Sequence, residues 1–136
     1  MRGSVEHLNP VGLHKNPAYS QVVVTSGEVK TVYVGGQNAV DDTGDVVGAD
    51  DVKVQAEQIF ENLETALAAA GAQLDDVVKW NVYLVQGQPP QPAFEAFQRV
   101  WGNRPNPPLI TLLFVSGLAH PDYLMEIDAV AVVPEQ

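Results

Sequence analysis

The chain of 136 residues contains no cysteine, few basic residues and no long hydrophobic run. The absence of cysteine excludes disulfide bonds, thiolate zinc sites and cysteine nucleophiles. No stretch approaches the ~20 apolar residues that a membrane-spanning helix needs, and the N-terminus lacks an apolar run of signal-peptide length. We therefore expect a cytoplasmic protein with no membrane partner.

Basic side chains are scarce, because seven Lys and Arg residues stand against seventeen Asp and Glu residues. The resulting formal net charge of −10 repels a phosphate backbone and an anionic membrane surface. The few basic residues are scattered along the chain and form no stripe. Nucleic acid is therefore not an expected partner.

Motifs that hold phosphates, nucleophiles or metals are also missing. The chain contains neither GxSxG nor GxGxxG. Its three histidines, His7, His14 and His120, do not have the spacing of metal ligands. We expect no metal site and no cofactor.

The organisation predicted from the pattern is an N-terminal arm, residues 1–16, followed by a single domain, residues 17–136. Proline and glycine in the arm favour loop or extended chain. The β-branched runs Gln21–Thr25 and Thr31–Val34 are separated by a short polar segment that contains Gly27. This pattern is typical of an antiparallel hairpin.

Two adjacent glycines, Gly35 and Gly36, follow the second of these runs. Glycine adds no side chain and reaches positive φ freely. The pair indicates either a β-bulge or a place where another group approaches the backbone closely, and the sequence leaves both open.

Two helices are expected after the glycine pair. Apolar residues recur at three- and four-residue steps between Asp50 or Asp51, which can cap the first turn, and Gly71, which can end the helix. A strand over 76–85 follows, and Pro92 suits the first turn of a second helix that ends at Gly102. Residues 104–108 form a stiff, proline-rich crossover.

Two apolar strands, Leu109–Val115 and Tyr123–Val133, close the chain. The first is apolar on both faces and so needs a cover on each side. The two helices supply one layer only. We therefore expect other subunits to cover the second face of the sheet, in a cyclic homo-oligomer.

The last strand carries two carboxylates, Glu126 and Asp128, on one face, while its other face is wholly apolar. Charged residues are seldom fully buried. The acids therefore indicate either a solvated strand face or a functional site.

The order of these elements, together with several local strings, resembles the RidA/YjgF family of small homotrimeric proteins. The strings are PAYSQ at 17–21, VGGQ at 34–37, GAQLDDVVK at 71–79, FEAF at 94–97 and HPDYLMEIDAVAV at 120–132. The resemblance implies an α+β, chorismate-mutase-like (YjgF-type) fold, in which two helices cover a mainly antiparallel mixed β-sheet. It also implies a trimeric barrel with ligand clefts between subunits.

Deaminases of this family hydrolyse reactive enamines and imines such as 2-aminoacrylate. The resemblance implies that Glu126 is the acid that orients or activates water, with Asp128 as its neighbour. The ligand-binding residues that it implies are Tyr19, Gly36, Gln37, Gln91, Ile110, Thr111 and Asp128.

One departure from the family pattern affects the expected activity. The deaminases carry Pro-Ala-Arg-Ser/Thr after the crossover, and the arginine clamps the substrate carboxylate. Here the string is Pro-Leu-Ile-Thr, which puts Ile110 in the place of that arginine. Ile110, Leu112 and Phe114 are expected to form an apolar wall beside Glu126, which would favour the neutral acid.

Three functions follow as hypotheses. The leading one is a homotrimer that binds a small neutral or apolar metabolite and has little or no 2-aminoacrylate-type deaminase activity. The alternative is a metal-independent hydrolase of a different enamine, imine or related molecule, in which Glu126 directs water. The third is a structural or protein-binding trimer with a closed cleft. Some relatives are named endoribonucleases, but the acidic charge and the lack of a histidine pair disfavour that activity.

Overall fold

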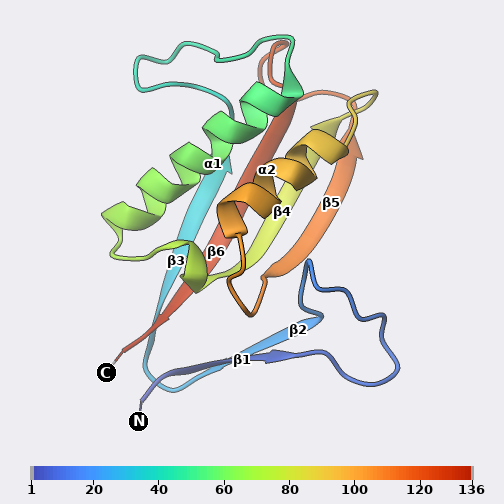
Figure 1. Cartoon of the computed structure of the whole chain (residues 1–136). Helices are drawn as coiled ribbons and strands as arrows, with labels where there is room; N and C mark the ends of the chain where they lie inside the picture. The colour runs from blue at the N-terminus through green and yellow to red at the C-terminus, as the bar shows by residue number, and fades with distance from the viewer. Residues whose placement is uncertain (1, 136) are drawn as a thin grey trace.

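A four-stranded mixed sheet forms the centre of the fold (Figure 1). The computed structural model describes residues 2–135, so the two end residues of the expected arm and domain, Met1 and Gln136, lie outside the described residues. The strands lie in the order β3 (Val29–Gln37), β6 (Met125–Pro134), β4 (Val77–Val85) and β5 (Leu109–Val115). Only the β4–β5 pair is parallel.

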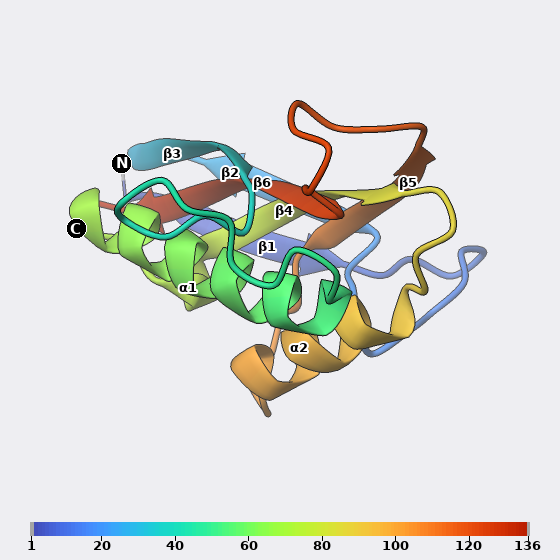
Figure 2. The ribbon, with the colours of Figure 1, turned by 90° about the horizontal axis from the view of Figure 1, so that it is seen from above.

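Two helices, α1 (Val52–Ala69) and α2 (Gln91–Trp101), cover one face of this sheet, as Figure 2 shows from above. Asp51 caps α1, because its carboxylate accepts from the backbone N–H of Lys53 and Val54 at 3.0 and 3.3 Å. Gly71, with φ +72°, follows the last turn. The predicted helix boundaries are therefore confirmed. Among the described residues, neither helix has the length and apolar character needed to cross a membrane.

The core lies between the helices and the sheet. Its aromatic centre consists of Phe60 on α1, Trp80 on β4, and Phe97 and Trp101 on α2. The ring of Trp80 meets Phe60 and Phe97 edge-on, with centroids 5.8 and 6.1 Å apart.

The alternation predicted for the last strand is confirmed in β6. Met125, Ile127 and Ala129 are buried toward the helices, whereas Glu126 and Asp128 are half-buried on the other face. We call this other face, which the helices do not cover, the open face of the sheet.

The predicted hairpin between residues 21 and 34 is wrong in its pairing. Both strands form, as β2 (Val22–Ser26) and β3, but β2 pairs antiparallel with β1 (Ser4–Leu8) and β3 pairs with β6. The backbone of Arg2 and Gly3 crosses directly over Gly27 and Glu28, which puts the N-terminal chain at the bend between β2 and β3. Local sequence does not reveal that β2 and β3 each pair with a strand other than their neighbour in the chain, because those partners, β1 and β6, come from other parts of the chain.

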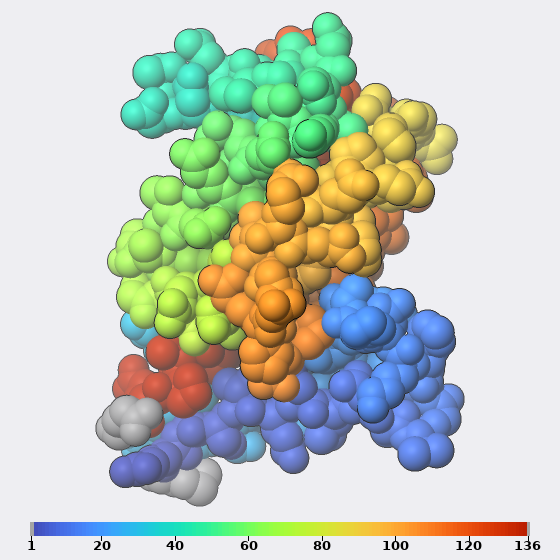
Figure 3. Space-filling view, viewed as in Figure 1, coloured from blue at the N-terminus to red at the C-terminus, as the bar shows by residue number. Residues whose placement is uncertain are grey.

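The β1–β2 pair crosses one end of the sheet (Figure 1), and the loop that joins its strands lies against the end of α2 in the space-filling view (Figure 3). Buried Ser20 fixes this position: its backbone N–H donates to the carbonyl of Pro108 at 3.2 Å, and its hydroxyl donates to that of Pro107. The hydroxyl also lies 3.1 Å from Nδ1 of His7 on β1. Hydrogen bonds therefore hold the segment after the arm against the residues that immediately precede β5.

The strand β5 is at the edge of the sheet and is more exposed than predicted. Leu112 and Phe114, on the helix side, are 40% and 47% exposed, and Leu113, on the open face, is 50% exposed. The expectation that the helices cover one face of β5 holds only in part, because Ile110 packs against the core while Leu112 and Phe114 stay exposed. On the open face, Tyr33 of β3 is 79% exposed.

Candidate functional site

Glu126 lies against the backbone of the predicted glycine pair. The register between β3 and β6 shifts between Val34 and Gln37, which confirms the bulge. A methyl group on Gly36 would lie 2.7 Å from Cδ of Glu126, so the Glu126 side chain approaches the backbone closely and would have to shift if Gly36 carried a side chain. The glycine pair therefore marks both a β-bulge and a close approach of another group to the backbone.

An amide side chain holds the Glu126 carboxylate in place. Nδ2 of Asn38, just after β3, donates to Oε1 of Glu126 and to the carbonyl of Met125, each at 3.2 Å. The backbone carbonyl of Asn38 in turn accepts from Asn62 of α1 at 3.0 Å. The acid therefore has a fixed position while remaining half-exposed, which suits a group that orients a water molecule.

Asp128 is bonded on both carboxylate oxygens. Asn81 donates to Oδ1 at 2.7 Å and the Tyr83 hydroxyl donates to Oδ2 at 3.2 Å, both from the adjacent strand β4. The negative charge of Asp128 is the main cause that raises the pKa of Tyr83, with smaller effects from partial burial, the hydrogen bond and Glu126. Tyr83 therefore remains a proton donor at neutral pH.

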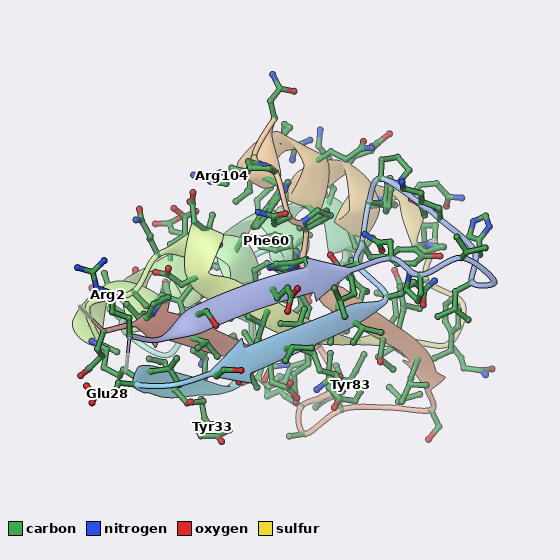
Figure 4. All side chains as sticks on the ribbon, turned by 90° about the horizontal axis from the view of Figure 1, so that it is seen from below. Arg2, Glu28, Tyr33, Phe60, Tyr83 and Arg104 are labelled. Carbon is green, nitrogen blue, oxygen red and sulfur yellow. The ribbon has the colours of Figure 1, made fainter. Side chains whose placement is uncertain are left out.

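These polar groups all face away from the helices. Figure 4 shows Phe60 between the helices and the sheet, and Tyr33 and Tyr83 on the opposite side. Thr111 is on the same open face, because it lies opposite Asn81 in the parallel register of β4 and β5. Gln37 ends β3 beside this group, and its side chain donates to the carbonyl of Gly35 at 3.1 Å.

Ile110 faces the other way. It lies opposite Trp80 in the register of β4 and β5, and it lines a pocket with Trp80, Phe97 and Ile127 on the helix side. The expected apolar wall of Ile110, Leu112 and Phe114 is thus separated from Glu126 by the sheet within one chain. The separation follows from the alternation of side chains along neighbouring strands, which places Ile110 and Glu126 on opposite faces of the sheet.

Two further predicted residues, Tyr19 and Gln91, are chain neighbours of residues near Ile110. Tyr19 is half-buried and precedes Ser20, whose backbone bonds to Pro108 at the start of β5. Gln91 is exposed at the first turn of α2, next to Pro90, which lines the pocket. The predicted site residues therefore fall into two sets. We call Ile110, together with Tyr19 and Gln91, whose backbones adjoin the start of β5 and the pocket, the apolar half-site. We call Gly36, Gln37, Thr111, Glu126 and Asp128 the acidic half-site.

Sequence reasoning missed the polar partners of the acids. Asn38, Asn81 and Tyr83 hold Glu126 and Asp128 by hydrogen bonds. The available signal was that Asn81 and Tyr83 share one face of the strand predicted over 76–85. The Trp80 side chain is buried in the core, and its indole N–H has no acceptor among the described residues.

Two of the arginines that the structure describes, Arg104 and Arg99, are paired with carboxylates outside both half-sites. Arg104 forms an ion pair with Asp75 at 2.7 Å and donates to the carbonyls of Val100 and Trp101, which ties the crossover to α2. Arg99 forms an ion pair with Glu57 at 2.8 Å on the outer surface of the helices. Within residues 2–135, no three His, Asp or Glu side chains gather as metal ligands would.

Known proteins resemble this chain in sequence and in fold. A family model described as Endoribonuclease L-PSP matches residues 13–133. A RutC family protein of Saccharolobus solfataricus is 38% identical over 114 residues, which cover 83% of this chain and 85% of that protein.

Solved structures extend the comparison. A Yersinia pestis protein of the conserved Rid protein family has a TM-score of 0.82 at 29% identity and covers 93% of this chain and 97% of its own. E. coli TdcF with bound serine has a TM-score of 0.68 at 27% identity, covering 75% and 80%. The predicted α+β, chorismate-mutase-like fold is therefore confirmed for the single chain.

The contact between Gly36 and Glu126 can be tested with a matched pair of alanine variants. Gly36→Ala should push the Glu126 carboxyl away from Asn38, whereas Gly35→Ala meets nothing within 4 Å. Because alanine restricts the unfolded chain, Gly35→Ala should stabilise the fold by about 0.4–1 kcal/mol, and Gly36→Ala should gain less or lose stability. The measurements are thermal unfolding and the NMR signals of the Asn38 amide group, and unchanged Asn38 signals in Gly36→Ala would contradict this geometry.

Proposed function

Because this chain belongs to the endoribonuclease L-PSP family, the RidA/YjgF family that its motifs resemble, we propose that it is a homotrimer that binds a small neutral or apolar metabolite in clefts between subunits. It has little or no deaminase activity on 2-aminoacrylate-type imines. The observation that carries the proposal is the pocket that Ile110 lines, which has no charged side chain. The resemblance implies that Ile110 stands in the position of the arginine of the family's deaminases. The cytoplasm remains the expected location.

The proposal of a trimer is supported by the exposed apolar side chains on the open face of the sheet. The open face bears the exposed side chains of Tyr33 and Leu113, and large exposed apolar patches mark interaction surfaces. Glu126 and Asp128 on this face already have hydrogen-bond partners, so an approaching subunit would not leave them unpaired. The two half-sites lie on opposite sides of the sheet, so in our proposal one subunit's apolar half-site meets the acidic half-site of its neighbour.

The specificity for uncharged ligands is supported by energetics. A charge-assisted hydrogen bond contributes ~1.5–3 kcal/mol, and an arginine fork makes two such bonds. Placing a carboxylate beside Ile110 also removes part of its hydration. Together these effects weaken a carboxylate ligand by at least ~10²-fold. The serine found in E. coli TdcF is such a ligand, and we expect this chain not to bind it.

A second function is favoured by the acidic half-site. Asn38 holds Glu126 at 3.2 Å, and Tyr83, whose hydroxyl donates to Asp128, lies opposite Glu126 in the register of β4 and β6. A carboxylate in a fixed position is able to orient a water molecule. The alternative function is therefore a metal-independent hydrolase of another enamine, imine or related small molecule.

The first test measures keto-acid release from freshly generated 2-aminoacrylate. The wild-type chain should be at least ~10²-fold slower than arginine-bearing relatives, because it lacks the carboxylate clamp. Ile110→Arg should raise the rate, whereas the volume-matched control Ile110→Leu should not. A wild-type rate equal to that of the relatives would overturn the proposal.

The second test concerns the alternative function and applies to any substrate found by screening uncharged imines and enamines. Glu126→Gln keeps the shape of the side chain and removes its charge, so turnover should fall by ~10²-fold or more while the variant stays folded and oligomeric. The exposed carboxylate Glu135 provides a control, and Glu135→Gln should leave turnover unchanged. Unchanged turnover in Glu126→Gln would remove this residue from the mechanism.

The third test concerns the open face and uses two equally exposed leucines. Leu113 on β5 and Leu13 in the arm are 50% and 52% exposed. Leu113→Lys should weaken the trimer by at least ~10²-fold, because association would desolvate the new charge, whereas Leu13→Lys should not. The measurement is sedimentation equilibrium, with circular dichroism to check folding. A monomeric wild type at micromolar concentration, or an intact Leu113→Lys trimer, would refute this assembly.

A further inference from the structure

A chain of hydrogen bonds connects α1 to Glu126 at the end of β3. The strand β3 ends at Gln37, which lies opposite Ile127 of β6, so the carbonyl of Met125 lies beyond the last residue that β3 pairs. The side-chain amide of Asn38 donates to that carbonyl at 3.2 Å and thereby takes the place of a strand partner. The same amide donates to Oε1 of Glu126. The position of Asn38 therefore determines where this carboxylate is held.

The amide of Asn38 has one orientation that satisfies its neighbours. Both partners of its Nδ2, a backbone carbonyl and a carboxylate, are acceptors. Turning the amide over would place its own oxygen against these two oxygens and remove the donor from both. The bond occupies Oε1 of Glu126, whereas Oε2 lies toward the backbone of Gly36 and accepts no hydrogen bond within residues 2–135. Oε2 is therefore the carboxylate oxygen that is available to a water molecule.

Asn62, in the middle of α1, holds the turn that carries Asn38. Its Nδ2 donates to the backbone carbonyls of Asn38 and Val40, at 3.0 and 2.9 Å. Between these two residues lies Ala39, whose side chain is buried. The backbone N–H of Val40 also donates to the carbonyl of Asn38 at 2.8 Å, which closes a tight turn. A rotation of this turn would move Asn38 away from β6, and the two bonds from Asn62 oppose that rotation.

The side-chain amide of Asn62 is used completely. Its Nδ2 meets two carbonyls, and its Oδ1 accepts from Nε2 of Gln58, one turn earlier in α1, at 2.9 Å. Asparagine is not a favoured residue in the interior of a helix, because its side chain competes for backbone hydrogen bonds. What it contributes at this position is therefore its contact with the turn after β3.

We propose that Asn62 is a positioning residue for Glu126: through the turn that carries Asn38, it keeps Oε1 bonded and leaves Oε2 to orient a water molecule. This inference rests on the proposed hydrolase function, in which Glu126 directs that water. Asn62 does not touch the reacting atoms, because α1 lies on the other side of the sheet from the acids (Figure 2). A carboxylate that turns freely would present water in many directions, and the rate of reaction depends on alignment.

The first measurement is the ¹³C signal of the Glu126 side-chain carboxyl, assigned with Glu126→Gln. Asn62→Leu removes the amide and keeps a side chain of similar size, so the turn should relax and the Glu126 signal should move. Asn38→Leu removes the bond to Oε1 directly and should move the signal in the same direction. The control is Thr65→Val, one turn after Asn62. The Thr65 hydroxyl bonds only within α1, to the carbonyl of Glu61, so this variant should leave the signal in place.

The second measurement is the rate of keto-acid release from 2-aminoacrylate in the Ile110→Arg background. Adding Asn62→Leu should lower kcat by about tenfold, the worth of one hydrogen bond to a charged group. KM should stay unchanged, because the introduced arginine still binds the substrate carboxylate. The losses from Asn62→Leu and Asn38→Leu should not add, since both variants act on Glu126 through the same bond.

Gln58→Met provides a second variant, in case circular dichroism shows that Asn62→Leu does not fold. Gln58 is half-buried, and its replacement frees Oδ1 of Asn62 without removing either bond to the turn. The amide of Asn62 is then less restrained, so the Glu126 signal should move in the same direction as in Asn38→Leu, by a smaller amount.

The outcomes separate this inference from the proposed function. An unmoved Glu126 signal in folded Asn62→Leu, or losses of kcat that add with those of Asn38→Leu, would refute the positioning role and leave Glu126 as the group that directs water. Turnover that persists in Glu126→Gln would overturn that function and the inference together. An inactive Ile110→Arg chain would contradict the proposed role of Ile110, and the carboxyl signal would then decide the positioning role.

Discussion

The sheet has two faces, and the chain supplies helices for only one of them. Apolar residues therefore gather on the helix side of β6 and β4, where Met125, Ile127 and Trp80 are buried. The open face carries the polar groups, but it also exposes Tyr33 and Leu113. A surface that carries both polar groups and exposed apolar side chains suits an interface between subunits. A partner can cover the apolar side chains while the carboxylates keep their hydrogen bonds within the chain. The proposed trimer follows from this imbalance between one layer of helices and two faces of sheet.

The same alternation divides the candidate site. Glu126 and its neighbours point to the open face, whereas Ile110 points toward the helices, so no ligand can touch both within one chain. In the proposed assembly each cleft takes an apolar wall from one subunit and an acid from another. Binding and assembly then depend on each other, since neither half-site is complete alone.

In our proposal Ile110 stands where the deaminases of the family carry an arginine. Ile110 lines a pocket that has no charged side chain and extends to Trp80 and Phe97. In our proposal the ligand is therefore selected by shape and apolar contact instead of by charge. The acidic half-site remains bonded to Asn38 and keeps its geometry, whichever ligand the apolar half-site selects.

The sequence by itself determined the two helices, the strands from β2 onward and the faces of β6, because these depend on short-range periodicity and on caps such as Asp51 and Gly71. It left open whether the glycine pair forms a bulge, and it did not predict β1 in the arm. It also determined the family, through strings that extend over most of the chain. Only the tertiary structure decided that β2 pairs with β1, that Ile110 and Glu126 lie on opposite faces, and that the Trp80 donor has no acceptor. Strand partners, strand order and the environment of a buried atom depend on contacts between residues far apart in the chain, and periodicity along the chain contains no information about them.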